Sequence, residues 1–202
     1  MIEYIIGRLV DLTAATATLQ TAGGVGYGLN ISLNTYASLE NEAASDRDVK
    51  LYVHESIRED AWTLYGFSRE EERALFRLLI GVSGVGAASA RVILSTYSVA
   101  ELEHILSGSD VAALKKVKGI GAKTAERIVV DLRDKINVGG STLISVGPGG
   151  KISGGEVYEE ALAALVALGF VRSAAQKALD KVFGADPSLK VDVAIKKALA
   201  LL

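Results

Sequence analysis

The first third of the chain has the apolar pattern of short β-strands. Every second residue from 49 to 53 is aliphatic, which is typical of a strand with one face in a core. Runs of this kind, rich in β-branched and aromatic residues, cover residues 2–10, 14–20, 25–32, 49–57 and 61–67. A short helix is expected over residues 35–40, with Asn34 as its N-cap. Five strands and one helix within residues 1–66 predict a small Greek-key barrel.

From residue 67 onward the apolar spacing becomes helical. Ser68 with Glu71 predicts a capping box ahead of an apolar helix, and Ser98 with Glu101 predicts another. The helical pattern continues to residue 136, and we expect a bundle of about five short helices.

The pattern then breaks off in a glycine-rich stretch. Residues 137–155 contain seven glycines and a proline. A segment of this composition buries too little apolar surface to offset the entropy of ordering its backbone. We therefore expect a flexible tether between two folded parts.

Residues 156–202 predict a small module of three helices. Gly169 is expected to end the first helix, and Ser173 to begin the second. Pro187 separates the second helix from the third. The apolar residues expected to form the core of this module are Leu162, Leu165, Val166, Leu168 and Leu199. A module of this size is more typical of a docking unit than of an active site.

Composition and charge narrow the class of protein. The chain has no cysteine, which excludes a disulfide scaffold and cysteine-ligated zinc. Its start has no signal-peptide pattern and no apolar run is long enough to span a bilayer, so we expect a cytoplasmic protein without membrane contact. The net charge is -2, so any contact with nucleic acid must come from a local basic cluster. Residues 114–127 form one, with five basic residues and only Glu126 opposing them.

The basic cluster belongs to a short internal repeat. Residues 79–94, LIGVSGVGAASARVIL, align with residues 114–129, LKKVKGIGAKTAERIV, at an offset of 35. Each copy predicts the end of one helix, a tight turn with two glycines flanking an aliphatic residue, and the start of a second helix. The aliphatic residues, Val85 and Ile120, are expected to point into the core.

Turns with paired glycines can bind phosphate. They expose backbone N–H groups, and the next helix adds its unpaired first amides and its dipole. A pair of helix-hairpin-helix motifs would therefore contact the DNA backbone without reading base sequence. The first copy has Ala88 where the second has Lys123, so it must rely on backbone donors, helped by Arg91. The predicted DNA-backbone contacts are Gly84, Gly86, Ser89, Arg91, Lys118, Gly119, Gly121, Lys123, Thr124 and Arg127.

Two other classes of protein stay open at this point. The first is an interaction scaffold in which the turns only join helices. The second is a nuclease or glycosylase, which needs a carboxylate cluster for metal or a catalytic Lys or Asp, and neither occurs at suitable spacing. His54 and His104 are isolated, and Glu70, Glu71 and Glu72 are expected to favour a helix N-terminus. The chain also lacks a Walker lysine motif, so we expect no catalysis, no metal and no cofactor.

Five segments occur in an order that resembles a known family. They are GGVGYG, HESIREDAWTLYGF, GVSGVGAASARVIL, VKGIGAKTAERIVVDLRDKI and EALAALVALGF. Over nearly the whole chain, they resemble the RuvA family of bacterial Holliday junction branch migration subunits. The resemblance implies an α+β multidomain protein with an OB-like N-terminal β-barrel (1–66), a central helical domain with two helix-hairpin-helix motifs (67–136) and a small C-terminal three-helix domain (156–202).

The resemblance also implies partners. Family members form homotetramers, which can pair on a four-way DNA junction in recombination and repair. Their C-terminal domain engages the hexameric ATPase RuvB, the motor that moves the DNA arms, and the resolvase RuvC is a further expected partner. Glu59 and Asp60 match an acidic pin that repels phosphates at the crossover, and Arg58 beside them limits the repulsion.

Overall fold

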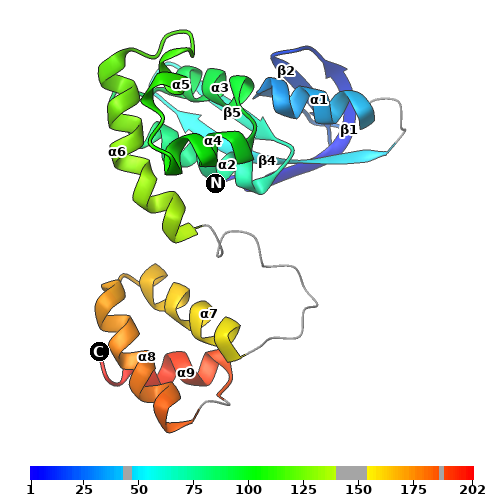
Figure 1. Cartoon of the computed structure of the whole chain (residues 1–202). Helices are drawn as coiled ribbons and strands as arrows, with labels where there is room; N and C mark the ends of the chain where they lie inside the picture. The colour runs from blue at the N-terminus through cyan, green and yellow to red at the C-terminus, as the bar shows by residue number, and fades with distance from the viewer. Residues whose placement is uncertain (43–46, 140–153, 187–188) are drawn as a thin grey trace. The chain divides into compact units, whose positions relative to one another are not determined.

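The computed structural model describes residues 1–42, 47–139, 154–186 and 189–202. The chain divides into two compact units, Met1–Ile144 and Ser145–Leu202 (Figure 1). In the described ranges, the first unit contains a five-stranded barrel and six helices, and the second contains three helices. This arrangement confirms the predicted α+β fold class. No helix in the described ranges is both long and apolar enough to cross a membrane.

The barrel is closed by five strands in the order β1-β2-β3-β5-β4. The strands and the helix between the third and fourth are β1 (Tyr4–Leu12), β2 (Thr16–Gln20), β3 (Gly26–Ile31), α1 (Leu33–Glu42), β4 (Asp48–Ile57) and β5 (Trp62–Phe67). All neighbours pair antiparallel except β3 and β5, which pair parallel. Val49, Leu51 and Val53 are buried while Lys50 is exposed, so the alternation along β4 fills the barrel core as predicted. This topology is that of an OB-type barrel.

The predicted N-cap at Asn34 is wrong. The helix α1 already includes Asn34, and the Ser32 hydroxyl accepts the backbone N–H of Thr35 at 3.0 Å. Ser32 is the last residue before the helix, so its side chain reaches the free amides of the first turn. The Asn34 side chain instead donates to the carbonyl oxygens of Leu94 at 2.6 Å and Tyr97 at 2.9 Å. It therefore ties the barrel to the helices that follow.

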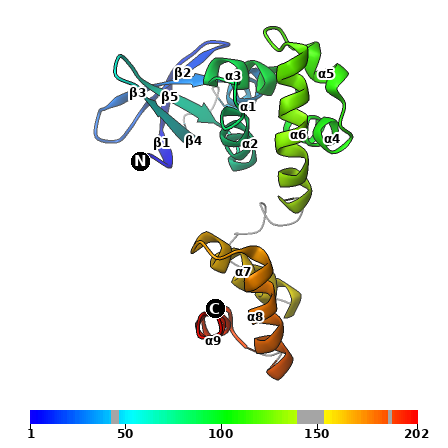
Figure 2. The ribbon, with the colours of Figure 1, turned by 90° about the vertical axis from the view of Figure 1, so that its left-hand side faces the viewer.

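Five helices complete the first unit, the number that the sequence predicted. They are α2 (Glu70–Ile80), α3 (Ala87–Thr96), α4 (Val99–Ser107), α5 (Val111–Lys115) and α6 (Ala122–Gly139). The helix α2 lies next to the barrel, and α6 lies on the far side of the bundle (Figure 2). The capping box of Ser98 and Glu101 is confirmed at the start of α4.

The capping box predicted at Ser68 is wrong, because barrel contacts displace it. Arg69 precedes α2, and no side chain caps that helix. The backbone N–H of Ser68 donates to the Thr35 hydroxyl at 3.1 Å. Glu72, expected at an open helix end, is buried and accepts hydrogen bonds from the hydroxyls of Ser32 and Thr35. Burial raises the pKa of Glu72, and its hydrogen bonds join α2 to the start of α1.

An ion pair between buried Arg73 and exposed Glu3 makes a second joint between the barrel and α2. The Arg73 guanidinium donates to the Glu3 carboxylate at 2.6 Å, to the Glu3 carbonyl at 2.7 Å and to Glu70 at 2.8 Å. The Arg73 side chain is 5 % exposed, and the nearby guanidinium lowers the pKa of Glu3. Because Arg73 is buried, loss of the Glu3 carboxylate leaves its charge with one partner fewer, so we expect this loss to lower stability. The barrel and the helices therefore form one unit.

The second unit consists of α7 (Gly154–Ala167), α8 (Arg172–Ala185) and α9 (Val191–Leu199). Gly169 ends α7 as predicted. It has φ +97°, its N–H donates to Val166, and the N–H of Phe170 donates to Leu165. This is the Schellman motif. Ser173 does not cap α8, because the helix has already begun at Arg172.

Three of the predicted core residues of this unit are surface residues. Leu162 and Leu165 are fully buried, but Val166, Leu168 and Leu199 are 40 %, 62 % and 39 % exposed. Small residues on α8 and α9 fill the core instead, which keeps the helices close together.

The predicted tether is shorter at both ends, because α6 continues to Gly139 and α7 begins at Gly154. Its central part and Pro187 lie outside the described residues.

Candidate nucleic-acid interface

The internal repeat is also a repeat in the structure. The helices before the two turns end at Ile80 and Lys115, and the helices after them begin at Ala87 and Ala122. Both pairs of boundaries keep the offset of 35. The aliphatic residue of each turn is buried, at 5 % exposed for Val85 and 6 % for Ile120. The two copies therefore form the same local structural motif, as predicted.

Equivalent hydrogen bonds hold the two turns. The N–H of Val85 donates to Val82 at 3.0 Å, and the N–H of Ile120 donates to Val117 at 3.1 Å. The first glycines, Gly84 and Gly119, have φ +92° and +89°, a region that side-chain-bearing residues rarely adopt. These glycines are therefore required by the backbone conformation alone.

The second glycine of each turn has a different role. Gly86 has φ −87° and ψ 169°, an extended conformation open to any residue, and Gly121 also lies outside the positive-φ region. A Cβ at either position would meet no atom within 4 Å. Nothing in the fold itself requires glycine here. Space for an approaching group is the remaining reason for a missing side chain.

The glycines of these turns are exposed, and their amides have no acceptor within the described part of the chain. They are Gly84, Gly86, Gly119 and Gly121. No side chain caps the first turn of α3, so its first amides are free as well. Each turn is therefore a cradle of unpaired donors at a helix N-terminus, which suits an anion such as phosphate.

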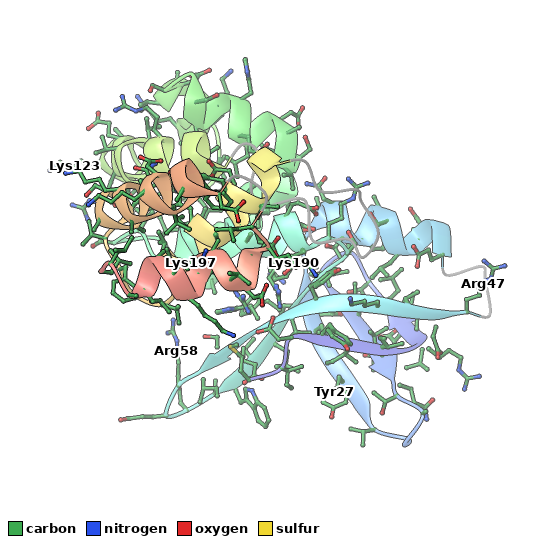
Figure 3. All side chains as sticks on the ribbon, turned by 90° about the horizontal axis from the view of Figure 1, so that it is seen from below. Tyr27, Arg47, Arg58, Lys123, Lys190 and Lys197 are labelled. Carbon is green, nitrogen blue, oxygen red and sulfur yellow. The ribbon has the colours of Figure 1, made fainter. Side chains whose placement is uncertain are left out.

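Basic side chains are concentrated beside the second turn. All of them are exposed: Lys115, Lys116, Lys118, Lys123 and Arg127. Lys123 points away from the ribbon into solvent (Figure 3). The Arg127 guanidinium also donates to the Ser83 carbonyl at 3.2 Å. This contact brings α6 of the second motif against the turn of the first, so the two cradles are neighbours.

The other predicted contacts divide into two groups. Ser89 and Thr124 are half-buried in the first turns of α3 and α6. Arg91 is turned to the barrel, where its guanidinium donates to the Ala15 carbonyl at 3.2 Å and to the Asn30 side chain at 3.1 Å. The structure thus places Arg91 at the joint between barrel and helices rather than among the other hairpin residues.

The predicted acidic pin is the tip of the β4–β5 hairpin. The N–H of Arg58 donates to the Ala61 carbonyl at 2.8 Å, which leaves Glu59 and Asp60 as the two turn residues. All four residues are exposed. Figure 3 shows Arg58 and Arg47 at opposite ends of β4, so the tip lies at the other end of this strand from Arg47. The sequence reading missed that Ile57 and Trp62, which flank this tip, are also exposed.

The residues considered for catalysis remain apart. His54 lies on β4 against the Phe76 ring, and burial followed by the charges of Arg77 and Arg73 lowers its pKa. His104 is exposed on α4. Within the described ranges, no three His, Cys, Asp or Glu residues come together as metal ligands.

A closed OB-type barrel joined to two exposed helix-hairpin-helix turns defines a class of modular DNA-binding proteins. Comparison with known families matches the RuvA N-terminal domain over residues 1–66, a SAM-like helix-hairpin-helix tandem over residues 76–134 and the RuvA C-terminal domain over residues 156–202. The chain belongs to the RuvA family.

Full-length relatives agree with this assignment. The chain is 48% identical to a protein of Parabacteroides distasonis, 46% identical to one of Bacteroides fragilis and 42% identical to one of Porphyromonas gingivalis. Each comparison covers 100% of both chains, and each relative is named Holliday junction branch migration complex subunit RuvA.

Proposed function

We propose that this protein binds four-way DNA junctions as the non-catalytic subunit of a branch-migration complex. It holds the junction open through contacts to the sugar-phosphate backbone and recruits the ATPase that moves the arms. The observation that supports this proposal most is the pair of matching turns in a chain of the RuvA family, whose exposed glycines have amides with no acceptor among the described residues. The proposed contacts are the hairpin residues Gly84, Gly86, Ser89, Gly119, Gly121, Lys118, Lys123, Thr124 and Arg127.

The proposal is tested by competition between a four-way junction and a linear duplex of the same base composition. We expect the junction to compete far better, with little dependence on sequence, because the contacts select the path of the backbone. Binding should also fall steeply with salt, since basic residues that neutralise phosphates release counterions. Equal affinity for the two DNAs would contradict junction specificity, and metal-dependent cleavage by the pure protein would favour the enzyme alternative.

Charge reversal of the pin separates binding from strand guidance. We expect Glu59→Lys with Asp60→Lys to tighten junction binding at least about tenfold at low salt, since each carboxylate near a phosphate costs ~1 kcal/mol even in water. The same variant should slow motor-driven branch migration, because attracted strands are no longer pushed toward the arms.

A control for this variant needs the same change of charge elsewhere on the barrel. Asp11→Lys with Asp48→Lys provides it, since both residues are exposed on barrel strands away from the pin. The control should bind and migrate junctions like the parent. If the pin variant folds and assembles normally but binds the junction more weakly, the electrostatic role of the pin is refuted.

We also propose that the protein acts as a homotetramer in the cytoplasm and that two tetramers can enclose one junction. Tyr4, Ile6 and Val10 on the outer face of β1 are 52 %, 49 % and 50 % exposed, a stripe suited to contact with a second copy. Residues 156–202 are the proposed docking site for RuvB, and RuvC is a further proposed partner on the junction. Mass measurements of the free and junction-bound protein test the assembly state.

A further inference from the structure

Two large apolar side chains stand uncovered at the last rung of the β4–β5 hairpin. Ile57 is 70 % exposed and Trp62 is 67 % exposed. The two residues are direct partners across the hairpin, so their side chains lie on the same face. They form the rung next to the turn that carries Glu59 and Asp60.

Ile57 and Trp62 lie on the face of the hairpin that points into the barrel core, but at positions past the end of the barrel. On β4 the inward positions pass from buried Val53 through half-buried Glu55 to exposed Ile57. On β5 they pass from buried Gly66 through Leu64, which packs against the barrel core, to exposed Trp62. Ile57 and Trp62 thus occupy positions typical of core residues, but they lie beyond the end of the barrel, where no described barrel residue buries them. No other side chain among the described residues provides cover.

The carboxylates of Glu59 and Asp60 restrict which kind of ligand can contact Ile57 and Trp62. Two carboxylates in the adjoining turn repel phosphates, so a nucleic acid that reaches the indole must present an uncharged surface. An unstacked base is uncharged, flat and apolar on its faces, and aromatic side chains bind bases by stacking.

We propose that Trp62, supported by Ile57, is a stacking platform for bases that lose their neighbours at the junction crossover. This proposal rests on the proposed function, because such bases are exposed only where strands exchange between arms. The carboxylates of the pin keep the backbones away, while the indole holds a base during the exchange. The tip would then combine repulsion of phosphate with attraction of base.

The test uses the fact that Trp62 is the single tryptophan of the chain. Fluorescence excited at the red edge of the absorption band, where the seven tyrosines absorb little, therefore reports on this residue alone. A four-way junction is titrated in, while a dye on one DNA arm measures binding by anisotropy. We expect the indole emission to be quenched with the same midpoint as the anisotropy change. A linear duplex at saturation, and a junction with abasic sites at the crossover, should quench it much less.

The outcomes separate the two proposals. If anisotropy shows no preference for the junction, the proposed function fails. If the junction binds specifically but the emission stays unchanged, only the stacking platform is refuted. Indole emission that is already blue-shifted and shielded from acrylamide without DNA, and that becomes accessible on dilution, would place a second copy of the chain on Trp62 and also refute the platform.

Variants provide an independent readout. We expect Trp62→Ala to weaken junction binding about fivefold or more, the lower end of the effect of losing one base stack. Trp62→Phe should retain most of the affinity, because a phenyl ring still stacks. Val25→Ala is the matched control, since Val25 is a 51 % exposed apolar residue between β2 and β3, outside the helix-hairpin-helix turns and the pin, and it should bind like the parent. Equal loss in the Ala and Phe variants, or no loss in either, would contradict stacking.

Discussion

Gly86→Val combined with Gly121→Val is expected to weaken junction binding by about 100-fold or more, with the melting temperature of the protein unchanged. In the proposed complex each second glycine leaves room for a phosphate to reach the turn amides. A valine side chain would occupy that space. A hydrogen bond to a charged group contributes ~1.5–3 kcal/mol, so losing one at each turn accounts for a change of this size.

Stability should be spared because neither position needs glycine for the fold. Both lie outside the positive-φ region, and a Cβ at either one meets no atom within 4 Å. Gly84→Val with Gly119→Val is the contrasting pair, since φ +92° and +89° strain any residue with a side chain. That pair should lower the melting temperature as well as the affinity.

The matched control places valine in two other open glycine positions. A Cβ at Gly23 or Gly184 would also meet no atom within 4 Å, and neither residue has a positive φ. Gly23→Val with Gly184→Val should bind the junction like the parent, and Gly184→Val should not weaken α8, because glycine is a poorer helix former than valine. Parental junction affinity in a folded Gly86→Val, Gly121→Val protein would show that the turns only join helices, as in the scaffold alternative.

Removal of residues 156–202 is expected to abolish stimulation of the motor ATPase and leave junction affinity unchanged. Both hairpin turns lie in the first compact unit, and the three C-terminal helices have a separate core. DNA binding should therefore not depend on them. The measurement is ATP hydrolysis by the RuvB partner on junction DNA, with junction affinity measured in parallel.

A surface variant makes this prediction sharper than a truncation. Leu168 and Val171 are 62 % and 70 % exposed at the α7–α8 corner, so Leu168→Asp with Val171→Asp should preserve the fold while removing an apolar contact surface. We expect most of the ATPase stimulation to be lost. Val25→Asp, at a 51 % exposed position between β2 and β3, is the control. Normal stimulation by the truncated protein would refute the docking role of this domain.

The sequence predicted best what depends on local spacing. The alternation along β4 and the paired glycines at offset 35 determine their own backbone conformations, so the barrel strands and both hairpin turns are where they were expected. The Ser98 capping box is confirmed for the same reason, since all of its atoms lie within one helical turn.

Features that depend on tertiary contacts could not be predicted. Ser68 has the correct spacing for a cap, but its amide bonds to Thr35, which lies 33 positions away. Arg91 has the correct spacing for a phosphate contact, but the barrel provides acceptors for it. Ile57 and Trp62 have the pattern of buried residues, and only the length of the hairpin beyond the barrel exposes them.

Pulsed amide hydrogen exchange on the free and the junction-saturated protein tests most directly whether phosphate binds at the hairpin turns. We expect exchange at Gly84, Gly86, Gly119 and Gly121 to slow when the junction binds, because phosphate oxygens accept these N–H groups. Exchange at free-protein rates in all four glycines, in a complex shown to be saturated, would contradict phosphate binding at these turns.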